Sequence, residues 1–230
     1  MKKVVVLTGA GMSAESGVST FRDSNGLWCN HRIEEVASPI AWENNQQLVL
    51  DFYNQRRKQL FEVDPNDGHK WLVKLEEKFD VQIVTQNVDD LHERAGSTNV
   101  LHLHGELKKV RSTIDPNLIY TLNHWELKKG DNCELGSQLR PHIVWFGESV
   151  PMIKTAMSIV SGADILIVIG TSMVVYPAAS LINFVGDSIP KYYIDPTAFQ
   201  VEGISNLQII SEKAGTGVPK LVSQLLNQYY

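Results

Sequence analysis

The chain has 230 residues, of which 43% are hydrophobic, and its 21 Lys and Arg against 26 Asp and Glu give a net charge of −5. This composition argues against disorder, and the acidic balance argues against a dedicated nucleic-acid-binding protein, which would carry a basic face. No apolar run is long enough to span a bilayer, and two cysteines, Cys29 and Cys133, do not suggest a disulfide framework. We therefore expect one cytoplasmic globular domain with no membrane or nucleic-acid partner.

A glycine-rich turn follows the first predicted strand. Residues 4–7 are a continuous apolar, β-branched run, which is typical of a strand buried on both faces. Gly9, Gly11 and Ala14 then match G-x-G-x-x-A, a turn that lets backbone approach a pyrophosphate and offers N–H groups at a helix start. The second strand with an acidic residue, expected about 20 residues later, is missing. Phe21-Arg22-Asp23 occurs instead, and fits either a lid over a cofactor or a surface loop with one anchored aromatic.

A long amphipathic helix comes next and carries a Tyr/Arg pair. Short helices are expected within 31–42, and the apolar spacing predicts a helix over 45–61. Tyr53 and Arg56 are three residues apart, so their side chains share one face of that helix. On spacing alone, the pair fits a Tyr packed on an Arg that binds a surface acid.

Polar residues follow the next predicted strand, at 81–85, after a helix over 67–78. Gln86, Asn87 and Asp89 would lie at its carboxyl edge, where open α/β sheets bind ligands, although Asp89 also fits a cap for a helix over 90–95. The following strand, 100–104, alternates and places His102 and His104 on one face. These histidines fit either a metal pair, with His124 as a third ligand, or ordinary hydrogen-bonded side chains.

The last third of the chain again alternates strands and helices. Strands are predicted over 143–146, 164–169, 191–194 and 207–210, and helices over 153–162, 178–185 and 218–230. Gly170-Thr171-Ser172 follows the clearest buried strand, and such a small-residue turn can hydrogen-bond phosphate or ribose. The alternation predicts an α/β fold with a mostly parallel sheet, helices on both faces and a small insert.

Six motifs occur in order along nearly the whole chain. They are Gly9-Ala10-Gly11-x-Ser13-x-x-Ser16-Gly17-Val18-x-x-Phe21-Arg22, Thr85-Gln86-Asn87-Val88-Asp89, Leu91-His92, Leu103-His104-Gly105-Glu106, Trp145-Phe146-Gly147-Glu148 and Gly170-Thr171-Ser172. Together they resemble the sirtuins, the NAD-dependent protein deacylases, and the chain is most similar to the bacterial class III, desuccinylase-type members. The resemblance implies a Rossmann-like part at about 1–30, 65–107 and 140–230, with small-domain segments at about 31–64 and 108–139.

The resemblance also implies a role for each matching residue, with NAD as cofactor and acyl-lysine proteins or peptides as partners. His104 would be the catalytic base, and Asn87 and Asp89 would orient ribose and water. The residues implied to bind NAD are Gly9, Ala10, Gly11, Ala14, Phe21, Arg22, Gln86, Asn87, Asp89, Gly170, Thr171, Ser172, Asp195 and Ala214. Those implied to bind the peptide and its acyl group are Tyr53, Arg56, Val144, Phe146, Gly147 and Val175.

Two features set the expected specificity and metal content. In sirtuins that prefer acidic acyl groups, the Tyr and Arg matching Tyr53 and Arg56 hold the acyl carboxylate, and Arg57 is expected to be a solvated neighbour. Most sirtuins bind a structural zinc with two cysteine pairs, but here Ser112 replaces the first cysteine and Cys133 remains. Because such a site needs four ligands, we expect no zinc. The insert would instead be held by Ile114, Leu118, Ile119, Tyr120, Leu122 and Trp125.

We predict an NAD-dependent protein-lysine deacylase that removes succinyl or malonyl groups, and also acetyl, releasing nicotinamide and O-acyl-ADP-ribose. Two alternatives remain open from the residues alone. One is a non-catalytic NAD-binding module. The other is a metal-dependent hydrolase that uses His102 and His104.

Overall fold

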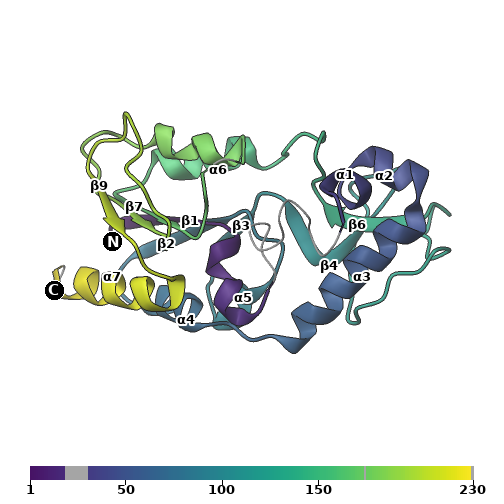
Figure 1. Cartoon of the computed structure of the whole chain (residues 1–230), viewed down its shortest axis with the longest axis horizontal. Helices are drawn as coiled ribbons and strands as arrows, with labels where there is room; N and C mark the ends of the chain where they lie inside the picture. Colours follow the sequence, from purple (N-terminus) through teal and green to yellow (C-terminus); the bar gives the residue numbers. More distant parts are fainter. Residues whose placement is uncertain (19–30, 174, 229–230) are drawn as a thin grey trace.

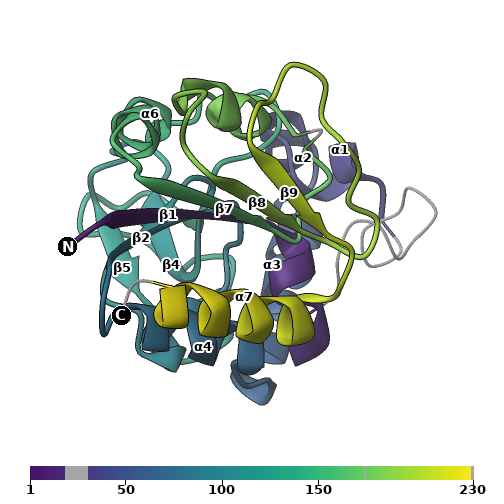
Figure 2. The same cartoon turned by 90° about the vertical axis from the view of Figure 1, so that its left-hand side faces the viewer.

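The computed structural model describes residues 1–18, 31–173 and 175–228, and a parallel sheet forms its centre. In these ranges six strands pair in the order β3-β2-β1-β7-β8-β9, all of them parallel (Figure 2). The strands are β1 (Lys3–Thr8), β2 (Asp80–Thr85), β3 (Val100–His102), β7 (Ile165–Ile169), β8 (Lys191–Ile194) and β9 (Leu207–Ile210). The runs of Val and Ile are typical of strands covered on both sides, so the predicted parallel sheet is confirmed.

Helices cover both faces of this sheet. They are α4 (Asp67–Leu75), α6 (Ile153–Ser161), α7 (Ala214–Gln228) and the 3-10 helix η4 (Ala178–Phe184). The first core surrounds this sheet: Val4 and Val6 of β1 pack with α4 and α7 on one face, whereas Val5 and Leu7 pack with α6 and η4 on the other. Figure 1 shows α6 above the sheet and α4 and α7 below it. The predicted α/β architecture is therefore confirmed, and no helix of the described ranges is long and apolar enough to cross a bilayer.

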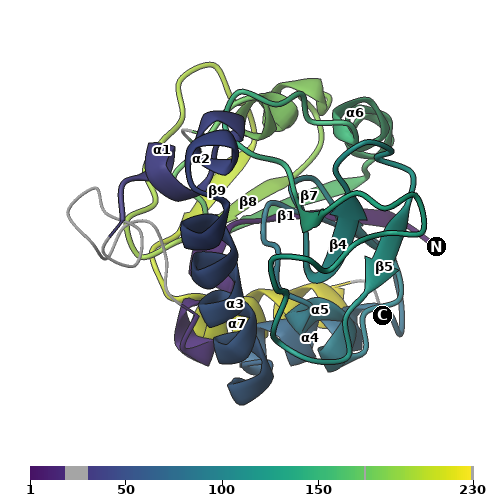
Figure 3. The ribbon, with the colours of Figure 1, turned by 90° about the vertical axis from the view of Figure 1, so that its right-hand side faces the viewer.

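A second apolar core lies at the other end of the molecule (Figures 1 and 3). Its elements are α1 (Ile33–Val36), α2 (Pro39–Asn44), α3 (Gln46–Glu62), β4 (Gly105–Ser112), β5 (Ile119–Thr121) and β6 (Leu139–Ile143). The three strands form an antiparallel sheet in the order β5-β4-β6. The sequence did not predict this sheet, and the strand expected over 143–146 ends at Ile143. Helix α5 (Leu91–Ala95) follows β2 along the chain.

The predicted packing of the insert is only partly correct. Tyr120 and Leu122 pack against the second core. Ile114 and Ile119 are instead exposed, with 65% and 43% of their surface open to solvent. Trp125 is also exposed, and Lys58 lies 5.6 Å from the centre of its ring. The antiparallel pairing of the strands, rather than a cluster of all these side chains, organises the segment.

The last helix begins four residues earlier than predicted. A helix was predicted over 218–230, but the structure places α7 over Ala214–Gln228. A Cβ atom on Gly217 would lie 2.6 Å from Cγ2 of Ile194, so glycine lets the helix pack closely on β8. The Glu15 carboxylate accepts a hydrogen bond of 2.7 Å from the Gly215 amide, which favours a helix start there.

Arg57 is buried, and the prediction that it is a solvated neighbour is wrong. Its side chain has no exposed surface and donates to the Leu107 and Trp125 carbonyls, both at 2.6 Å, and to Asn54 Oδ1 at 2.8 Å. Burial lowers the pKa of Arg57 to about 10, so the guanidinium is still charged at neutral pH. It ties α3 to β4 and to the segment after β5.

Replacing Arg57 by Met should therefore lower the free energy of unfolding by roughly 3–5 kcal/mol, because it leaves buried acceptors without their donor. Chemical denaturation would measure this loss. The control is Lys58→Met, which removes the same charge from the next, exposed position of α3 and should change stability by less than about 0.5 kcal/mol. Equal stabilities of the two variants would contradict the structural role of Arg57.

Candidate active site

Two glycine-containing turns, after β1 and after β7, meet at the point of the sheet where the strand order reverses. After β1 the chain adds β2 and β3 on one side, and after β7 it adds β8 and β9 on the other. Open α/β sheets bind ligands at such a switch point. A Cβ atom on Gly9 would lie 2.8 Å from the Gly170 carbonyl oxygen, and one on Gly170, with φ of 62°, would lie 2.3 Å from Met12 N. Only glycine permits this approach, which brings residues 9–11 beside 170–172 as predicted.

The amides of the two N-terminal glycines do not serve as the sequence suggested. The Gly9 N–H donates to Ile169 O at 3.0 Å, and the Gly11 N–H donates to Gly170 O at 2.8 Å. Both amides therefore hold the two turns together instead of facing a pyrophosphate. A helix was expected to start here, but the structure has two 3-10 turns, η1 (Ala10–Met12) and η2 (Ala14–Ser16). Ala14, at the start of η2, is exposed.

Asn87 and Asp89 converge on Ser13, a residue to which the sequence gave no role. The Asn87 amide donates to Gly9 O at 3.0 Å and to Ser13 Oγ at 3.1 Å. Asp89 is buried, and its carboxylate accepts from Leu91 N at 3.2 Å. Burial raises the pKa of Asp89, and its hydrogen bond with Ser13 offsets part of that rise. Ser13 thus joins the turn after β1 to the segment after β2.

His104 is oriented by a backbone carbonyl. Its Nδ1 lies 3.1 Å from Gln86 O, and a carbonyl can only accept, so Nδ1 carries the proton and the lone pair of the neutral ring is on Nε2. Burial lowers the pKa of His104, and the Gln86 carbonyl offsets this only in part. The ring is therefore neutral at pH 7 and has the protonation state of a general base.

The two histidines of the predicted pair differ in their partners. His102 Nδ1 lies 3.0 Å from Asn87 O, and its Nε2 lies 2.8 Å from Glu93 Oε1. Both ring nitrogens of His102 therefore bind acceptors, and neither presents a lone pair to a cation. Within the described ranges, no group of three or more His, Cys, Asp or Glu residues is arranged to hold a metal ion. The geometry does not support the metal-pair interpretation of His102 and His104.

Tyr53 and Arg56 lie beside the segment that follows β6. Trp145 Nε1 donates to the Tyr53 hydroxyl at 3.1 Å. The ring centre of Phe52 lies 5.1 Å from that of Tyr53 and 5.8 Å from the guanidinium carbon of Arg56. Tyr53 is fully buried and Arg56 is 7% exposed. Burial raises the pKa of Tyr53, so its phenol is neutral. Because its oxygen accepts the indole N–H, the phenol retains its own proton for donation.

Residues 144–148 are held in place from three directions. The Val144 N–H donates to His104 O at 2.9 Å, and the Trp145 N–H donates to Glu148 Oε2 at 2.8 Å. Arg140 stacks on the Trp145 ring at 3.3 Å and also donates to Glu148 at 2.7 Å. Burial alone would raise the pKa of Glu148, but the hydrogen bonds from Arg140 and Trp145 N lower it overall. This network fixes Val144 next to His104.

Comparison with known proteins agrees with this geometry. Residues 9–177 match the model of the Sir2 family. The chain belongs to the Sir2 family. It is 57% identical to an NAD-dependent protein deacylase of Helicobacter pylori, over 98% of both chains. It is 50% identical to an NAD-dependent protein deacylase of Bacteroides thetaiotaomicron, over 98% of this chain and 99% of that protein.

Solved structures of Sir2 homologues have the same fold as this sirtuin. A Sir2 homolog–NAD complex has a TM-score of 0.89 at 41% identity and covers 100% of this chain and 91% of that one. A mutant homologue in complex with 2′-O-acetyl ADP ribose gives the same score and identity, covering 99% and 93%. A Sir2 mutant with a p53 peptide and NAD has a TM-score of 0.78 at 27% identity, covering 97% and 93%.

The remaining predicted site residues of this sirtuin lie as follows. Asp195 directly follows β8 and is buried, and its Oδ1 accepts from the Thr197 amide at 2.9 Å and hydroxyl at 2.7 Å. Gln86 Nε2 lies 3.4 Å from Thr171 Oγ1, which joins the segments after β2 and β7. Ala214 is buried. The partly exposed positions are Ala10, Gly11, Val144 and Ser172, and the exposed ones are Phe146, Gly147 and Val175. Phe21 and Arg22 lie outside the described residues.

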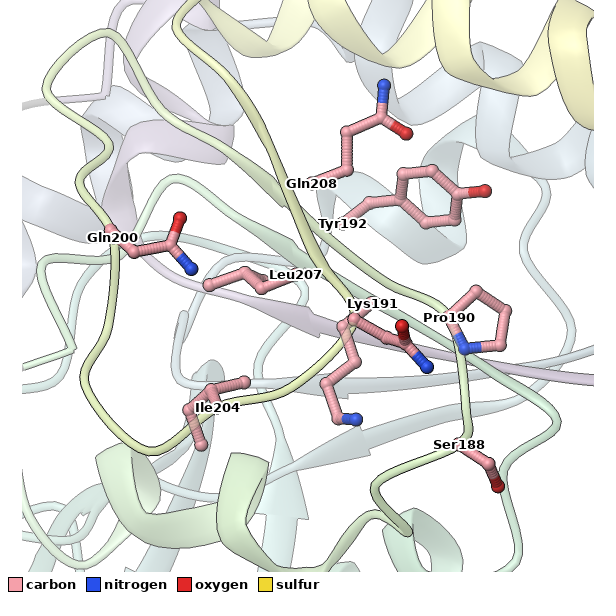
Figure 4. A pocket seen from close by; sticks show the side chains of 9 residues that line it. Ser188, Pro190, Lys191, Tyr192, Gln200, Ile204, Leu207 and Gln208 are labelled. Carbon is pink, nitrogen blue, oxygen red and sulfur yellow. The ribbon is translucent and has the colours of Figure 1, made fainter.

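A surface pocket lies away from these residues, at the amino ends of β8 and β9 (Figure 4). Lys191 lines it but is buried, and its ammonium donates to three carbonyls, those of Gly186, Ile189 and Ser205. Because these three bonds use every N–H of the ammonium group, Lys191 stabilises its own loop. None of the predicted site residues that the structure describes lines this pocket.

The sequence also did not predict a pair of buried histidines, His69 and His92, next to Thr8 at the end of β1. The rings of His69 and His92 lie 4.8 Å apart, and His92 Nε2 is 3.1 Å from Thr8 Oγ1. The Thr8 hydroxyl donates to Thr85 Oγ1, which in turn accepts from the Asn87 N–H at 3.0 Å. Burial lowers the pKa of His69 to about 4 and also lowers that of His92. Both rings are therefore neutral at pH 7.

The sirtuin should lose stability as the pH falls from about 6.5 to about 4. In this window an unfolded histidine binds a proton that the buried ring does not, which costs up to about 1.4 kcal/mol per pH unit for each histidine. Urea denaturation at several pH values would measure the slope. His69→Phe should have a shallower slope than the wild type, whereas His124→Phe, at an exposed position, should not. An unchanged slope in His69→Phe would exclude this origin of acid sensitivity.

Proposed function

We propose that this chain is an NAD-dependent protein-lysine deacylase. The observation that carries the proposal is the orientation of His104, whose neutral ring has its lone pair on Nε2 at the carboxyl edge of the sheet. Asn87 and Asp89 lie in the adjacent segment, joined through Ser13 to the turn after β1. Support comes from relatives with this activity in their names and from homologues solved with NAD and with 2′-O-acetyl ADP ribose.

The turns after β1 and β7 fit a dinucleotide. Both turns lie at the switch point of the parallel sheet, where open α/β sheets bind ligands, and the glycines at 9, 11 and 170 let the two turns approach each other there. The residues proposed to hold NAD are those of 9–11, Ala14, Phe21, Arg22, Gln86, those of 170–172, Asp195 and Ala214. Bound NAD would supply a ribose carbon at which the acyl oxygen of the lysine replaces nicotinamide. Nicotinamide would be released, and water would then free the lysine, so that the acyl group leaves on ADP-ribose.

The side chains proposed to surround the reacting ribose have separate roles. His104 removes a proton from a ribose hydroxyl through Nε2, and the Gln86 carbonyl holds the ring in the required tautomer. Asn87 is oriented towards the ribose by its bonds to Gly9 and Ser13. Asp89, buried next to it, orients a water molecule.

The acyl group proposed for this site is acidic, succinyl or malonyl, with acetyl as a weaker substrate. Arg56 would bind the distal carboxylate in a fork, and the Tyr53 phenol would donate a further hydrogen bond. The raised pKa of Tyr53 supports this role, because a neutral phenol donates where a phenolate would repel the carboxylate. Val144, Phe146, Gly147 and Val175 would line the path of the peptide.

Mass spectrometry of succinyl-lysine and acetyl-lysine peptides, incubated with and without NAD, tests the function. We expect both peptides to lose their acyl groups only with NAD, and the succinyl peptide to react faster. NAD binding without any peptide turnover would instead indicate a binding module. Turnover without NAD that stops on chelation would indicate a metal-dependent hydrolase.

We further propose that the insert folds without zinc. Cys133 Sγ lies 3.4 Å from Ser112 Oγ and 3.2 Å from Ser137 Oγ, and these two hydroxyls lie 2.8 Å apart. One thiol and two hydroxyls do not fit a metal that takes four nitrogen or sulfur ligands. Elemental analysis of purified protein should find no zinc, and prolonged EDTA treatment should not change deacylation. One zinc ion per chain would refute this proposal.

The two-part division of the chain also remains a proposal. The second core joins residues from 33–63 with residues from 110–139, in support of small-domain segments at about 31–64 and 108–139, and it also takes in Leu91, Leu107, Ile143 and Trp145 from the adjoining ranges. The Rossmann-like part would then comprise about 1–30, 65–107 and 140–230. We propose a cytoplasmic location, where NAD and acylated proteins are both present.

A further inference from the structure

The backbone N–H and the backbone carbonyl of Asn87 both bind side chains that have no role in the proposed reaction. Its N–H donates to Thr85 Oγ1 at 3.0 Å, and its carbonyl lies 3.0 Å from Nδ1 of His102. The His102 side chain is 8% exposed, and its Nε2 lies 2.8 Å from Glu93 Oε1 on α5. Neighbouring carbonyls, those of Gln86 and Asn87, are thus bound by two different histidines, His104 and His102.

The partners of His102 determine its protonation state. A carbonyl oxygen has no proton to donate, and neither has an ionised carboxylate, so both ring nitrogens must donate and the ring is an imidazolium. Burial alone would lower the pKa of His102, but the interactions with Glu93, the Asn87 carbonyl and Glu106 raise it overall. Correspondingly, burial would raise the pKa of Glu93, but the hydrogen bond from His102 lowers it overall.

Charged and titratable groups reach His102 from each neighbouring element. On α5 they are Glu93 and the neutral His92, and after β2 there is Asp89, whose pKa His102 lowers. On β4 there is Glu106, itself bound to Lys109 at 2.6 Å. Carboxylates therefore predominate around the ring, in agreement with a cationic His102.

We propose that His102, held as an imidazolium by Glu93, is a positioning residue that fixes the Asn87 carbonyl and so orients Asn87 for the reaction. This rests on the proposed deacylase function. When the ring loses one proton at alkaline pH, the carboxylate of Glu93 retains the proton on Nε2. The proton is lost from Nδ1, and with it the bond to Asn87. Turnover then falls although His104 is unaffected.

Two substitutions at His102 separate positioning from packing. His102→Leu removes the donor and should lower kcat by roughly 10- to 100-fold, with KM for NAD changed less than about threefold, because a misplaced group affects the reaction step most. The side-chain amide of His102→Asn can donate from nearly the same place as Nδ1, so this variant should recover most of the lost kcat. Equal kcat in the two variants would overturn the positioning role.

Glu93→Gln tests the role of the charge. A glutamine amide can donate to Nε2, so the neutral ring keeps its proton on Nδ1 and the bond to Asn87 survives deprotonation. We expect kcat of the wild type to fall as the pH rises above the ordinary imidazole pKa of about 6.5. The kcat of Glu93→Gln should stay level over the same range. The same alkaline fall in both proteins would contradict the proposed link between Glu93 and Nδ1.

A readout independent of activity comes from the nitrogen chemical shifts of the His102 ring in the full-length protein. We expect both nitrogens to carry protons at pH 7 and Nδ1 to lose its proton first as the pH rises. A neutral ring at pH 7, or loss from Nε2 first, would overturn the inference. If the shifts agree but no peptide is deacylated with NAD, the proposed function fails and the hydrogen-bonding arrangement stands.

Discussion

Replacing His104 by alanine should abolish deacylation and leave NAD binding nearly unchanged. A positioned general base contributes roughly 10²- to 10⁴-fold to a rate, and we expect kcat to fall within that range. The structural reason is that Nε2 of His104 carries the lone pair, while Nδ1 is bound to the Gln86 carbonyl. The imidazole acts on the ribose hydroxyl after nicotinamide has left, so the affinity for NAD should change by less than about threefold.

Calorimetric titration with NAD and a peptide assay would measure the two quantities separately. His124→Ala is the matched control, because that imidazole is exposed on the insert. The control should keep both binding and turnover. Turnover of His104→Ala at the wild-type rate would remove His104 from its role, and loss of NAD binding would show that the substitution damages the pocket.

Replacing Arg56 by methionine should reduce desuccinylation far more than deacetylation. A guanidinium that binds a carboxylate in a fork contributes two charge-assisted hydrogen bonds, each worth about 1.5–3 kcal/mol. We therefore expect kcat/KM for a succinyl-lysine peptide to fall by roughly 10²- to 10⁴-fold, whereas an acetyl-lysine peptide, which lacks the carboxylate, should change by less than about threefold. The two peptides should have the same sequence and differ only in the acyl group.

Lys58→Met provides the control for this experiment, since it removes a charge from the exposed side of α3. It should leave both peptides unaffected. Equal losses on the two peptides in Arg56→Met would reject the assignment of the acyl carboxylate to Arg56. Thermal unfolding of both variants would show whether the buried Arg56 also stabilises the fold.

The parallel sheet was predictable because its two central strands, β1 and β7, are continuous apolar runs rich in β-branched residues. Residues 4–7 and 165–169 need no partner to be recognised, since burial on both faces leaves no polar position in them. The strand β4 was not predictable from this pattern. It carries charged residues among the apolar ones, and a break in its register with β6 between Gly105 and Val110 disturbs the two-residue alternation. Its pairing with β6 joins residues far apart in the chain.

Motif residues were placed correctly at the edge of the sheet, but their partners were not foreseen. Neither Ser13 nor Arg57 differs in the sequence from an ordinary polar residue of a turn or helix. Arg57 is buried because carbonyls from Leu107 and Trp125 meet it, at separations of 50 and 68 residues. Likewise, the predicted strand over 100–104 placed His102 and His104 on one face, but β3 ends at His102, and only the acceptors around each ring distinguish their roles.

With His104 as the base, the acyl group of a lysine should pass to the ADP-ribose part of NAD. Quantifying all products of one reaction with a succinyl-lysine peptide is the most direct measurement of this transfer. We expect one nicotinamide and one O-succinyl-ADP-ribose for each lysine freed. Free succinate formed directly, with NAD left intact, would contradict it.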